Sequence, residues 1–336
     1  MRPPRIVVIT GGSAGVGRAA ARAFAEQGDW VAILARDDER VQAACAELRE
    51  SGGTALGIAV DVADAAQVEN AAERVERELG LISVWVNNVA TTVFAPITET
   101  TAEEFKQVTE VAYLGAVYGT KAALKRMLPR NEGVIVQTGS ALAYRSIPLQ
   151  SAYCAAKAAV RGFTDALRCE LIHERSKVRV TMVHLSAFNT PQFEWARNKL
   201  PQLVQPVPPI YQPSIAGEAI VRAANHPKRE WWVGWPAAKA ILSTRVLPGL
   251  GDRMAARSAW SGQQTEGPAA DYRPGNLFAA VPGAFSARGR FNTRARKHSL
   301  QWWLSKHRAG AAAFMVLALS GAAVALIVTA GGSLPP

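Results

Sequence analysis

Cysteine is scarce in this chain of 336 residues. The three cysteines form no CxxC pair, and they have no metal-ligand spacing with the five histidines, so we expect no metal site. A reducing compartment is the simplest interpretation. A long apolar run near the N-terminus is also missing, because Ile6–Ile9 is too short for a signal-peptide core and leads into a glycine turn. The N-terminal region is therefore expected to lie in the cytoplasm.

Acidic residues are missing from the end of the chain. After Asp271 there is none, whereas eight basic residues follow: Arg273, Arg288, Arg290, Arg294, Arg296, Lys297, Lys306 and Arg308. Of the net charge of +11, this tail supplies +8, which leaves 11 − 8 = +3 for residues 1–272. Because the basic character belongs to the tail and no nucleic-acid-binding motif accompanies it, we expect no nucleic-acid partner.

Apolar residues make up 49% of the chain and charged residues 19%, which is typical of a folded protein with a sizeable core. Short β-branched runs alternate with alanine-rich helical stretches, which predicts an α/β fold with a Rossmann-type doubly wound parallel sheet of about seven strands. The predicted strands are Arg5–Thr10, Trp30–Ala35, Ala55–Val60, Val84–Asn87, Gly133–Thr138, Val178–Leu185 and Glu230–Val233. The predicted helices are Gly15–Gln27, Asp38–Ser51, Asp64–Leu79, Thr101–Met127, Ser151–Arg175 and Ser214–Asn225.

Two stretches break this alternation. Asn189–Gln212 is rich in proline and aromatics, and its place after the sixth strand makes it a candidate lid over a ligand. After a first domain at 1–247, residues 248–308 are rich in glycine, proline and arginine, so they are expected to form a linker or an irregular extension.

The last part of the chain has no charged residue from Ala309 to Pro336. Ala309–Ala330 is long enough to cross a hydrocarbon core of roughly 30 Å, so we predict a transmembrane helix over 309–331. Basic residues and two tryptophans precede it, which predicts a single-pass C-terminal anchor with the N-terminal side in the cytoplasm. The alternative is a buried alanine-rich helix, but nothing else in the tail could cover one.

A glycine-rich turn follows the first predicted strand. Thr10-Gly11-Gly12-Ser13-Ala14-Gly15-Val16-Gly17 leads directly into a helix. Glycines there let the backbone approach a pyrophosphate, whose charge is favoured by the helix N-terminus. A plain strand-to-helix turn is the alternative, but the position at the first βα junction favours a dinucleotide site.

The second strand ends without the carboxylate that NAD enzymes usually place there. It ends in Ala35, followed by Arg36. The planar guanidinium of Arg36 suits a 2′-phosphate, so NADP(H) is favoured over NAD(H). Asp37 and Asp38 keep NAD(H) possible.

Tyr153 and Lys157 are four residues apart on a predicted helix, so both project from one face. A neighbouring ammonium, helped by an oxidised nicotinamide, would favour the phenolate and bring the pKa of Tyr153 into a useful range. Ser140, at the end of the fifth strand, could hold a carbonyl or hydroxyl oxygen beside that phenol. Alone, a Tyr-x-x-x-Lys pair is more often structural.

Together, these motifs resemble the classical short-chain dehydrogenase/reductase family over roughly residues 4–235. The resemblance rests on the glycine turn, Asp61-Val62 after the third strand, Asn87-Asn88 after the fourth, and Ser140 thirteen residues before Tyr153. It implies that Tyr153 exchanges the proton, that Lys157 holds the nicotinamide ribose and that Ser140 positions the substrate oxygen. The cofactor residues that it implies are Thr10, Gly11, Ser13, Gly15, Val16, Gly17, Arg36, Asp61, Val62, Asn87, Val111, Tyr153, Lys157 and Thr190.

The sequence departs from the family pattern at three places. Ala112 stands where the family usually has asparagine, and alanine cannot hold the proton-relay water, so either another group or a backbone-bound water replaces it or turnover is slow. Val89-Ala90 replaces the usual Ala-Gly, and Leu185-Ser186 replaces the usual Pro-Gly. The last change is expected to shift the nicotinamide pocket slightly.

The expected substrate is an apolar carbonyl compound or alcohol, because the candidate wall is aromatic. That wall comprises Tyr144, Phe188, Phe193 and Trp195, which could equally be core packing. The function favoured is a membrane-anchored NADP(H)-dependent oxidoreductase. The resemblance makes a homodimer or a homotetramer possible. The alternative is a catalytically weak nucleotide-binding scaffold. A third hypothesis is that the basic tail binds anionic lipid.

Overall fold

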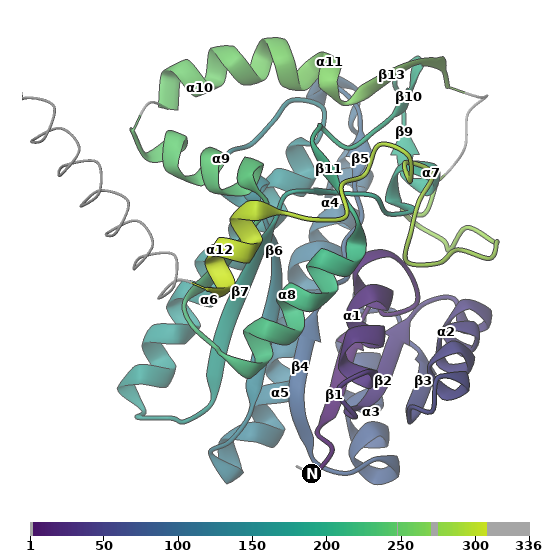
Figure 1. Ribbon diagram of the computed structural model, residues 1–336, viewed down its shortest axis with the longest axis vertical. Helices are drawn as coiled ribbons and strands as arrows, with labels where there is room; N and C mark the ends of the chain where they lie inside the picture. Colours follow the sequence, from purple (N-terminus) through teal and green to yellow (C-terminus); the bar gives the residue numbers. More distant parts are fainter. Residues whose placement is uncertain (1–2, 247, 270–274, 308–336) are drawn as a thin grey trace, which may run out of the picture.

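The computed structural model describes residues 3–246, 248–269 and 275–307. At its centre lies a seven-stranded sheet in the order β12-β7-β6-β4-β1-β2-β3, with every neighbouring pair parallel (Figure 1). Its strands are β1 (Ile6–Thr10), β2 (Trp30–Ala35), β3 (Ala55–Ala59), β4 (Ile82–Asn87), β6 (Val134–Ser140), β7 (Arg179–Leu185) and β12 (Glu230–Val233). The predicted Rossmann-type sheet is confirmed.

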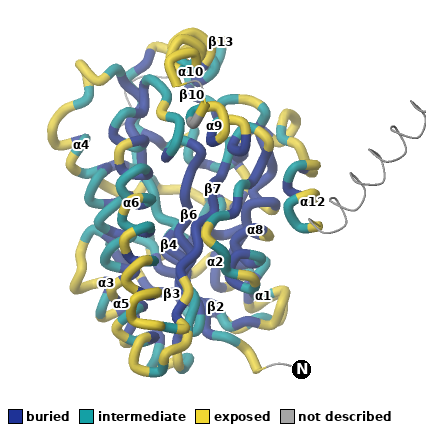
Figure 2. The backbone as a smooth tube through the Cα atoms, turned by 90° about the vertical axis from the view of Figure 1, so that its left-hand side faces the viewer, coloured by how far each residue is buried: buried dark blue, intermediate teal, exposed yellow. Residues whose placement is uncertain are grey.

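The strands are apolar without alternation because both faces of the sheet are covered. In β1, Val7 and Ile9 belong to the core on one face with Phe24, whereas Ile6 and Val8 pack into the core on the other face. Figure 2 shows the buried strands between helices whose outer surfaces are exposed.

The main helices begin close to the predicted positions, and side chains cap several of them. Asp37 and Asp64 accept hydrogen bonds from the first-turn amides of their helices, and Thr101 forms a capping box with Glu104. These helices are α1 (Gly15–Ala25), α2 (Asp38–Glu50), α3 (Ala65–Glu78), α4 (Ala102–Thr109), α5 (Gly115–Arg130), α6 (Ser151–His173) and α8 (Pro213–Asn225).

The stretch predicted as one helix over Thr101–Met127 is interrupted. Between α4 and α5 lies a π-helical segment, η2 (Glu110–Leu114), and Ala112 is buried at its centre. π-helical turns are rare and are found mostly as single turns at functional sites. Periodicity at the level of the sequence did not distinguish this segment from a regular α-helix.

Shorter elements surround the carboxyl end of the sheet. Three two-stranded pairs are β5 with β9, β8 with β11 and β10 with β13. Their bounds are β5 (Val93–Phe94), β8 (Ala187–Phe188), β9 (Arg197–Asn198), β10 (Gln202–Val204), β11 (Ile210–Tyr211) and β13 (Gln264–Pro268). The remaining elements are η1 (Ile97–Glu99), η3 (Ala141–Ala143), α7 (Gln192–Trp195), α9 (Trp235–Val246), α10 (Pro248–Met254), η4 (Ala255–Ala259), α11 (Trp260–Gly262) and α12 (Leu300–Lys306).

The described part of the extension, residues 248–269 and 275–307, packs against the first domain at several points. Strand β13 pairs with β10, and Trp302 of α12 lies buried with its ring edge on Trp231 of β12. The indole nitrogen of Trp302 also donates to Glu218 at 3.2 Å. Buried aromatic pairs of this kind hold chain segments together through large apolar contact areas.

No helix in the described ranges is both long enough and apolar enough to span a membrane. The predicted transmembrane helix at 309–331 lies outside the described residues. It therefore stays a prediction.

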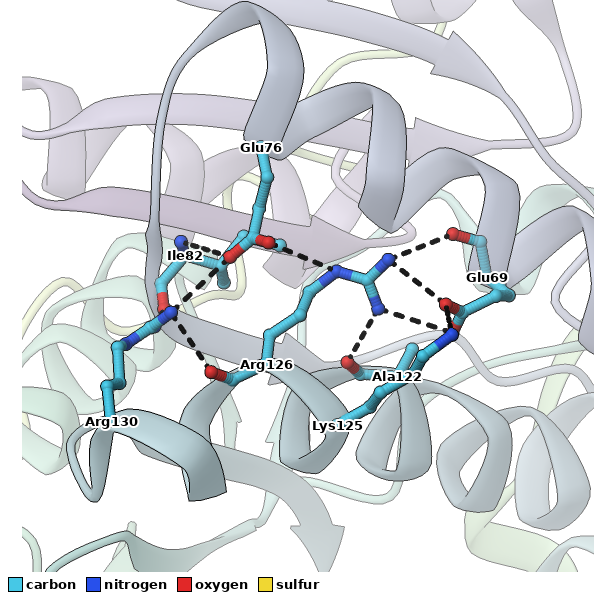
Figure 3. A network of polar contacts seen from close by, with 7 residues as sticks. All are labelled: Glu69, Glu76, Ile82, Ala122, Lys125, Arg126 and Arg130. Atoms are coloured by element: carbon cyan, nitrogen blue, oxygen red, sulfur yellow. Dashed lines mark hydrogen bonds and ion pairs between the residues drawn. The ribbon is translucent and has the colours of Figure 1, made fainter.

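A polar network joins α3 to α5 on one face of the sheet (Figure 3). Arg126 of α5 contacts Glu69 at 3.1 Å and Glu76 at 3.5 Å, and Arg130 contacts Glu76 at 3.4 Å. The Arg126 side chain is almost fully buried, so its charge is compensated within the network instead of by water. This arrangement holds the last turns of α5 against α3.

Candidate active site

A cavity of about 450 Å³ lies at the carboxyl end of the sheet. Its walls come from the loops after β1, β4, β6 and β7, from the first turns of α6 and from Asn189–Gln212. Ligands of doubly wound sheets bind at this edge. The segment Asn189–Gln212, expected as a lid, contributes Thr190, Phe193, Trp195 and the stretch 205–208 to the wall.

The glycine turn forms one end of the cavity. Gly11 and Gly15 have φ angles of +68° and +57°, which favour glycine, and both line the cavity with Ser13 and Val16. Gly17 is needed for a steric reason, because a Cβ there would lie 2.1 Å from the carbonyl oxygen of Gly11. The turn thus directs the amino end of α1 at the cavity, as a pyrophosphate site requires.

Ser140, Tyr153 and Lys157 all line this cavity. Ser140 is the last residue of β6, whereas Tyr153 and Lys157 lie one turn apart near the start of α6. The Ser140 side chain is close enough to the Tyr153 hydroxyl to lower the pKa of that phenol. The Lys157 ammonium donates to the carbonyl oxygen of Thr138 at 2.8 Å and lies 5.7 Å from the centre of the Tyr153 ring. The structure therefore brings together the three residues predicted to do the chemistry.

Burial dominates the acid–base properties of this pair. It raises the pKa of Tyr153 to about 12, although the neighbouring Ser140 side chain acts in the opposite direction. Burial also lowers the pKa of Lys157 to about 8. The sequence suggested a tyrosine pKa lowered by the lysine; in the protein alone, desolvation of the phenolate outweighs any such effect. Tyr153 is consequently neutral at pH 7 and holds a proton that it can donate.

Ala112 of η2 packs in the same apolar cluster as the ring of Tyr153. The cluster also contains Ala152, Ala156 and Tyr113. Ala112 has no side-chain group that could bind water. Any water on the route from Lys157 to solvent would therefore need backbone groups or other side chains.

Three of the four predicted wall aromatics line the cavity: Phe188, Phe193 and Trp195. Tyr144 does not. Its hydroxyl donates to Glu230 at 2.6 Å, and its ring edge packs against His184 with centroids 5.0 Å apart. The Tyr144 hydroxyl is thus hydrogen-bonded to a carboxylate 86 residues away in the sequence, and its ring lies outside the cavity wall.

The predicted cofactor residues divide into two groups. The group lining the cavity is Gly11, Ser13, Gly15, Val16, Tyr153, Lys157 and Thr190. The group that does not line it is Thr10, Gly17, Arg36, Asp61, Val62, Asn87 and Val111. The first group surrounds the places where a nicotinamide and a pyrophosphate would lie. Most of the second group lies in the core or toward the adenosine end.

Asn87 is one of the residues that do not line the cavity. Its amide donates to Thr120 and accepts from the indole of Trp85, so it is part of the buried structure between β4 and α5. The adjacent Asn88 lines the cavity instead, and its amide donates to the carbonyl oxygens of Thr10 and Gly11. The Asn-Asn pair marked the place, and the alternation of side chains along the strand decided which one faces the cavity.

Asp61, Val62 and Val111 also have structural partners. The Asp61 carboxylate accepts from the backbone amide of Ala63 at 3.0 Å. Val62 and Val111 are buried in the core on one face of the sheet, and Val62 leaves no room for a Cβ at Gly115. Thr10 is buried as well, and its hydroxyl accepts from the amide of Asn88.

Arg36 lies at the end of β2, where the sequence placed it, but the extension reaches it. Its guanidinium donates to the carbonyl oxygens of Asn276 at 2.5 Å, Leu277 at 3.4 Å and Phe278 at 3.2 Å. Asn276 also lines the cavity. We call residues 275–289 the strap. The strap therefore contacts the guanidinium that the sequence assigned to a 2′-phosphate.

Several lining residues were not anticipated from the sequence. They are Asn88, Arg145, Gln150, Pro236, Ala240 and Asn276. The last three belong to α9 and the strap, which have no motif and lie far from the glycine turn in the sequence. Among the described residues, no cluster of histidine, cysteine, aspartate or glutamate could hold a metal ion.

The sequence of this chain is similar to those of known proteins. The sequence pattern of the family described as short chain dehydrogenase matches residues 5–200. An uncharacterized oxidoreductase of Bacillus subtilis, YxnA, is 34% identical over 283 residues, covering 83% of this chain and 79% of its own. The 3-dehydrosphinganine reductase of Danio rerio is 30% identical over 226 residues, covering 65% of this chain and 68% of its own.

A solved structure is similar in fold. It is an alcohol dehydrogenase from the archaeon Thermococcus sibiricus complexed with 5-hydroxy-NADP, with a TM-score of 0.60 and 27% identity. The match covers 69% of this chain and 95% of that one. Together with the geometry of Ser140, Tyr153 and Lys157, these similarities identify an NAD(P)-dependent oxidoreductase that acts on CH–OH and C=O groups. The chain belongs to the short-chain dehydrogenase family.

Proposed function

We propose that this protein is an NADP(H)-dependent oxidoreductase that interconverts an apolar ketone or aldehyde with its alcohol. The observation that carries the proposal is the meeting of Ser140, Tyr153 and Lys157 in a cavity whose other walls are largely apolar. A partly buried, neutral phenol beside a serine hydroxyl suits protonation of a carbonyl oxygen.

The chain's own residues perform the proton chemistry. The bound nicotinamide supplies or accepts the hydride. In the reducing direction, the hydroxyls of Ser140 and Tyr153 donate to the carbonyl oxygen, and Tyr153 transfers its proton as negative charge develops there. The Lys157 ammonium stabilises the phenolate that remains. Reprotonation must then proceed without a polar side chain at position 112, through backbone groups or water.

NADP(H) is the proposed cofactor because the residue directly after Ala35 is an arginine and not a carboxylate. Replacing Arg36 with glutamine should raise the Kd for NADPH about tenfold or more relative to that for NADH, since hydrogen bonds to a charged phosphate are worth about 1.5–3 kcal/mol. Binding titrations with both cofactors measure this ratio. Any loosening of the strap affects both cofactors and cancels in the ratio.

The matched control is Arg74→Gln, which removes an exposed guanidinium on α3 that contacts Glu78. It should leave the ratio unchanged. An unchanged ratio in the Arg36 variant would instead assign the preference elsewhere.

Phe188, Phe193 and Trp195 support an apolar substrate, because their rings can be desolvated by an alkyl or aryl group without leaving polar atoms unpaired. We expect kcat/KM to rise with chain length in a series of aliphatic ketones, by about 1–3 kcal/mol of transition-state binding per well-packed methylene at most. Phe193→Ala should flatten this dependence. Comparable kcat/KM for short polar and long apolar carbonyl compounds would refute the proposal.

We also propose a C-terminal membrane anchor with the enzyme in the cytoplasm. The support is the uncharged run from Ala309 to Pro336, which follows Lys306 and Arg308. Fractionation of cells expressing the full chain, or a chain lacking 309–331, tests it. Recovery of the full chain in the soluble fraction would contradict the anchor.

A further inference from the structure

The strap is held at the cofactor groove by three arginines, which lie in α1, directly after β2 and in α2. Arg36 donates to the carbonyl oxygens of residues 276–278, Arg18 donates to that of Phe285 at 2.9 Å, and Arg40 donates to that of Val281. Arg18 also pairs with Glu47, and Arg40 with Asp37. Three guanidinium groups on this side of the groove therefore donate hydrogen bonds to backbone carbonyl oxygens of the strap.

A fourth donor comes from the glycine turn. The amide of Gly15, the first residue of α1, donates to the carbonyl oxygen of Ser286 at 3.1 Å. The amino end of a helix after such a turn is where a pyrophosphate binds, because its free amides and dipole favour negative charge. The strap therefore uses one of the groups that a dinucleotide needs.

An apolar side chain fixes the middle of the strap. Leu277 is 0% exposed and packs in the cluster that contains Ala90 and Val93, which follow β4. Its neighbour Phe278 is 55% exposed. The adjacent Asn276 side chain contacts the Thr91 hydroxyl at 3.4 Å. A leucine thus occupies space between the loop after β4 and Arg36, at the end of the groove where the adenosine would lie.

The strap is attached at both ends. A Cβ at Gly275 would lie 2.6 Å from the amide nitrogen of Arg197, and one at Gly289 would lie 2.4 Å from the carbonyl oxygen of Thr190. Figure 1 shows the strap at the same end of the sheet as α7 and the amino ends of α1 and α2. A segment held at two close contacts can leave the groove between them without detaching from the domain.

We propose that the strap and the adenosine half of the cofactor compete for the same site. The strap uses the guanidinium of Arg36, the amide of Gly15 and the space filled by Leu277. The adenosine ribose, its phosphate and the pyrophosphate need the same groups and the same space. The inference rests on the proposed NADP(H) dependence. Because the strap must leave before the cofactor can bind, the measured Kd for NADPH exceeds the intrinsic one by the inverse of the open fraction.

The test compares Leu277→Ala with Phe278→Ala in the full chain. The first variant removes buried contacts of the strap and should lower the Kd for NADPH about tenfold, because a buried leucine contributes strongly to the docked state. The second removes an exposed side chain on the same strap and should leave the Kd unchanged. Reduced nicotinamide mononucleotide, which lacks the adenosine half, should bind the wild type and both variants equally.

Hydrogen exchange on the wild-type protein tests the competition independently of the Kd measurements. Addition of NADPH should increase exchange of the amides in 275–289, whereas the mononucleotide should not. Slower exchange with NADPH, or weaker binding by Leu277→Ala, would mean that the strap closes over the cofactor and would overturn competition.

Failure of the proposed function is distinguishable from failure of this inference. Equal Kd values for NADPH in the wild type and in Leu277→Ala, with the mononucleotide bound by both, would overturn the competition alone. If neither nucleotide bound any of the three proteins, the cofactor assignment itself would be wrong, and the inference would fall with it.

Discussion

Phenylalanine in place of Tyr153 is expected to lower kcat for carbonyl reduction by about 10²- to 10⁴-fold, the usual contribution of a positioned general acid. The ring, which packs with Ala152 and Ala156, is retained, so the fold and the cavity should be unchanged. Only the hydroxyl beside Ser140 is lost. Initial rates of NADPH oxidation with a broad panel of carbonyl compounds measure the effect.

Tyr113→Phe is the matched control. This tyrosine packs in the same cluster but does not line the cavity, so its hydroxyl should not affect kcat. If Tyr153→Phe oxidised NADPH as fast as the wild type on every carbonyl tested, the catalytic assignment would be wrong. A nucleotide-binding scaffold would then be the better interpretation of the fold.

Methionine at position 157 is expected to have two opposite effects. Activity should fall by about 10²-fold or more, because no cation remains to stabilise the Tyr153 phenolate. Stability should increase at pH 7, because Lys157 is only 4% exposed and burial lowers its pKa from 10.5 to about 8. A shift of that size corresponds to an upper limit of about 3 kcal/mol in the free energy of unfolding.

The pH dependence of this gain follows from which state binds the proton more tightly. Between about pH 8 and 10.5 the unfolded lysine is protonated and the folded one is not, so wild-type stability rises with pH across that window. The advantage of Lys157→Met should therefore be largest below pH 8 and shrink above it. Urea unfolding of both proteins from pH 7 to 10 measures the difference.

The exposed Lys125→Met on α5 serves as the control, since its ammonium is largely in water and pairs with Glu69. It should change the stability by no more than about 0.5 kcal/mol at any of these pH values. A Lys157→Met protein no more stable than the wild type at pH 7 would show that the hydrogen bond to Thr138 fully offsets the desolvation of the ammonium.

The sheet was predictable because its signals are local. A strand covered on both faces needs a continuous apolar run, and Ile6–Thr10 is such a run followed by a glycine turn. The same holds for Tyr153 and Lys157, whose four-residue spacing on a helix already places them on one face. The π-helical segment at Glu110–Leu114 was missed, since one extra residue in a turn leaves no mark in the apolar pattern.

Side-chain direction was less predictable than position. The sequence located Asn87-Asn88 at the end of a strand, but contacts with Trp85 and Thr120 decided that Asn87 is internal. Likewise, the Tyr144 side chain lies outside the cavity wall, where its hydroxyl donates a hydrogen bond to Glu230. Both outcomes depend on partners that are brought near only by packing.

The sequence by itself determined the α/β fold, the glycine turn and the Ser140–Tyr153–Lys157 set, because short-range spacing and periodicity encode them. Only the tertiary structure decided what lies on Arg36. The strap carbonyls that it contacts are 240 to 242 residues away in the sequence and belong to a segment without periodicity or motif. Contacts between backbone oxygens and a distant guanidinium depend on the path of the chain, which side-chain identity alone does not specify.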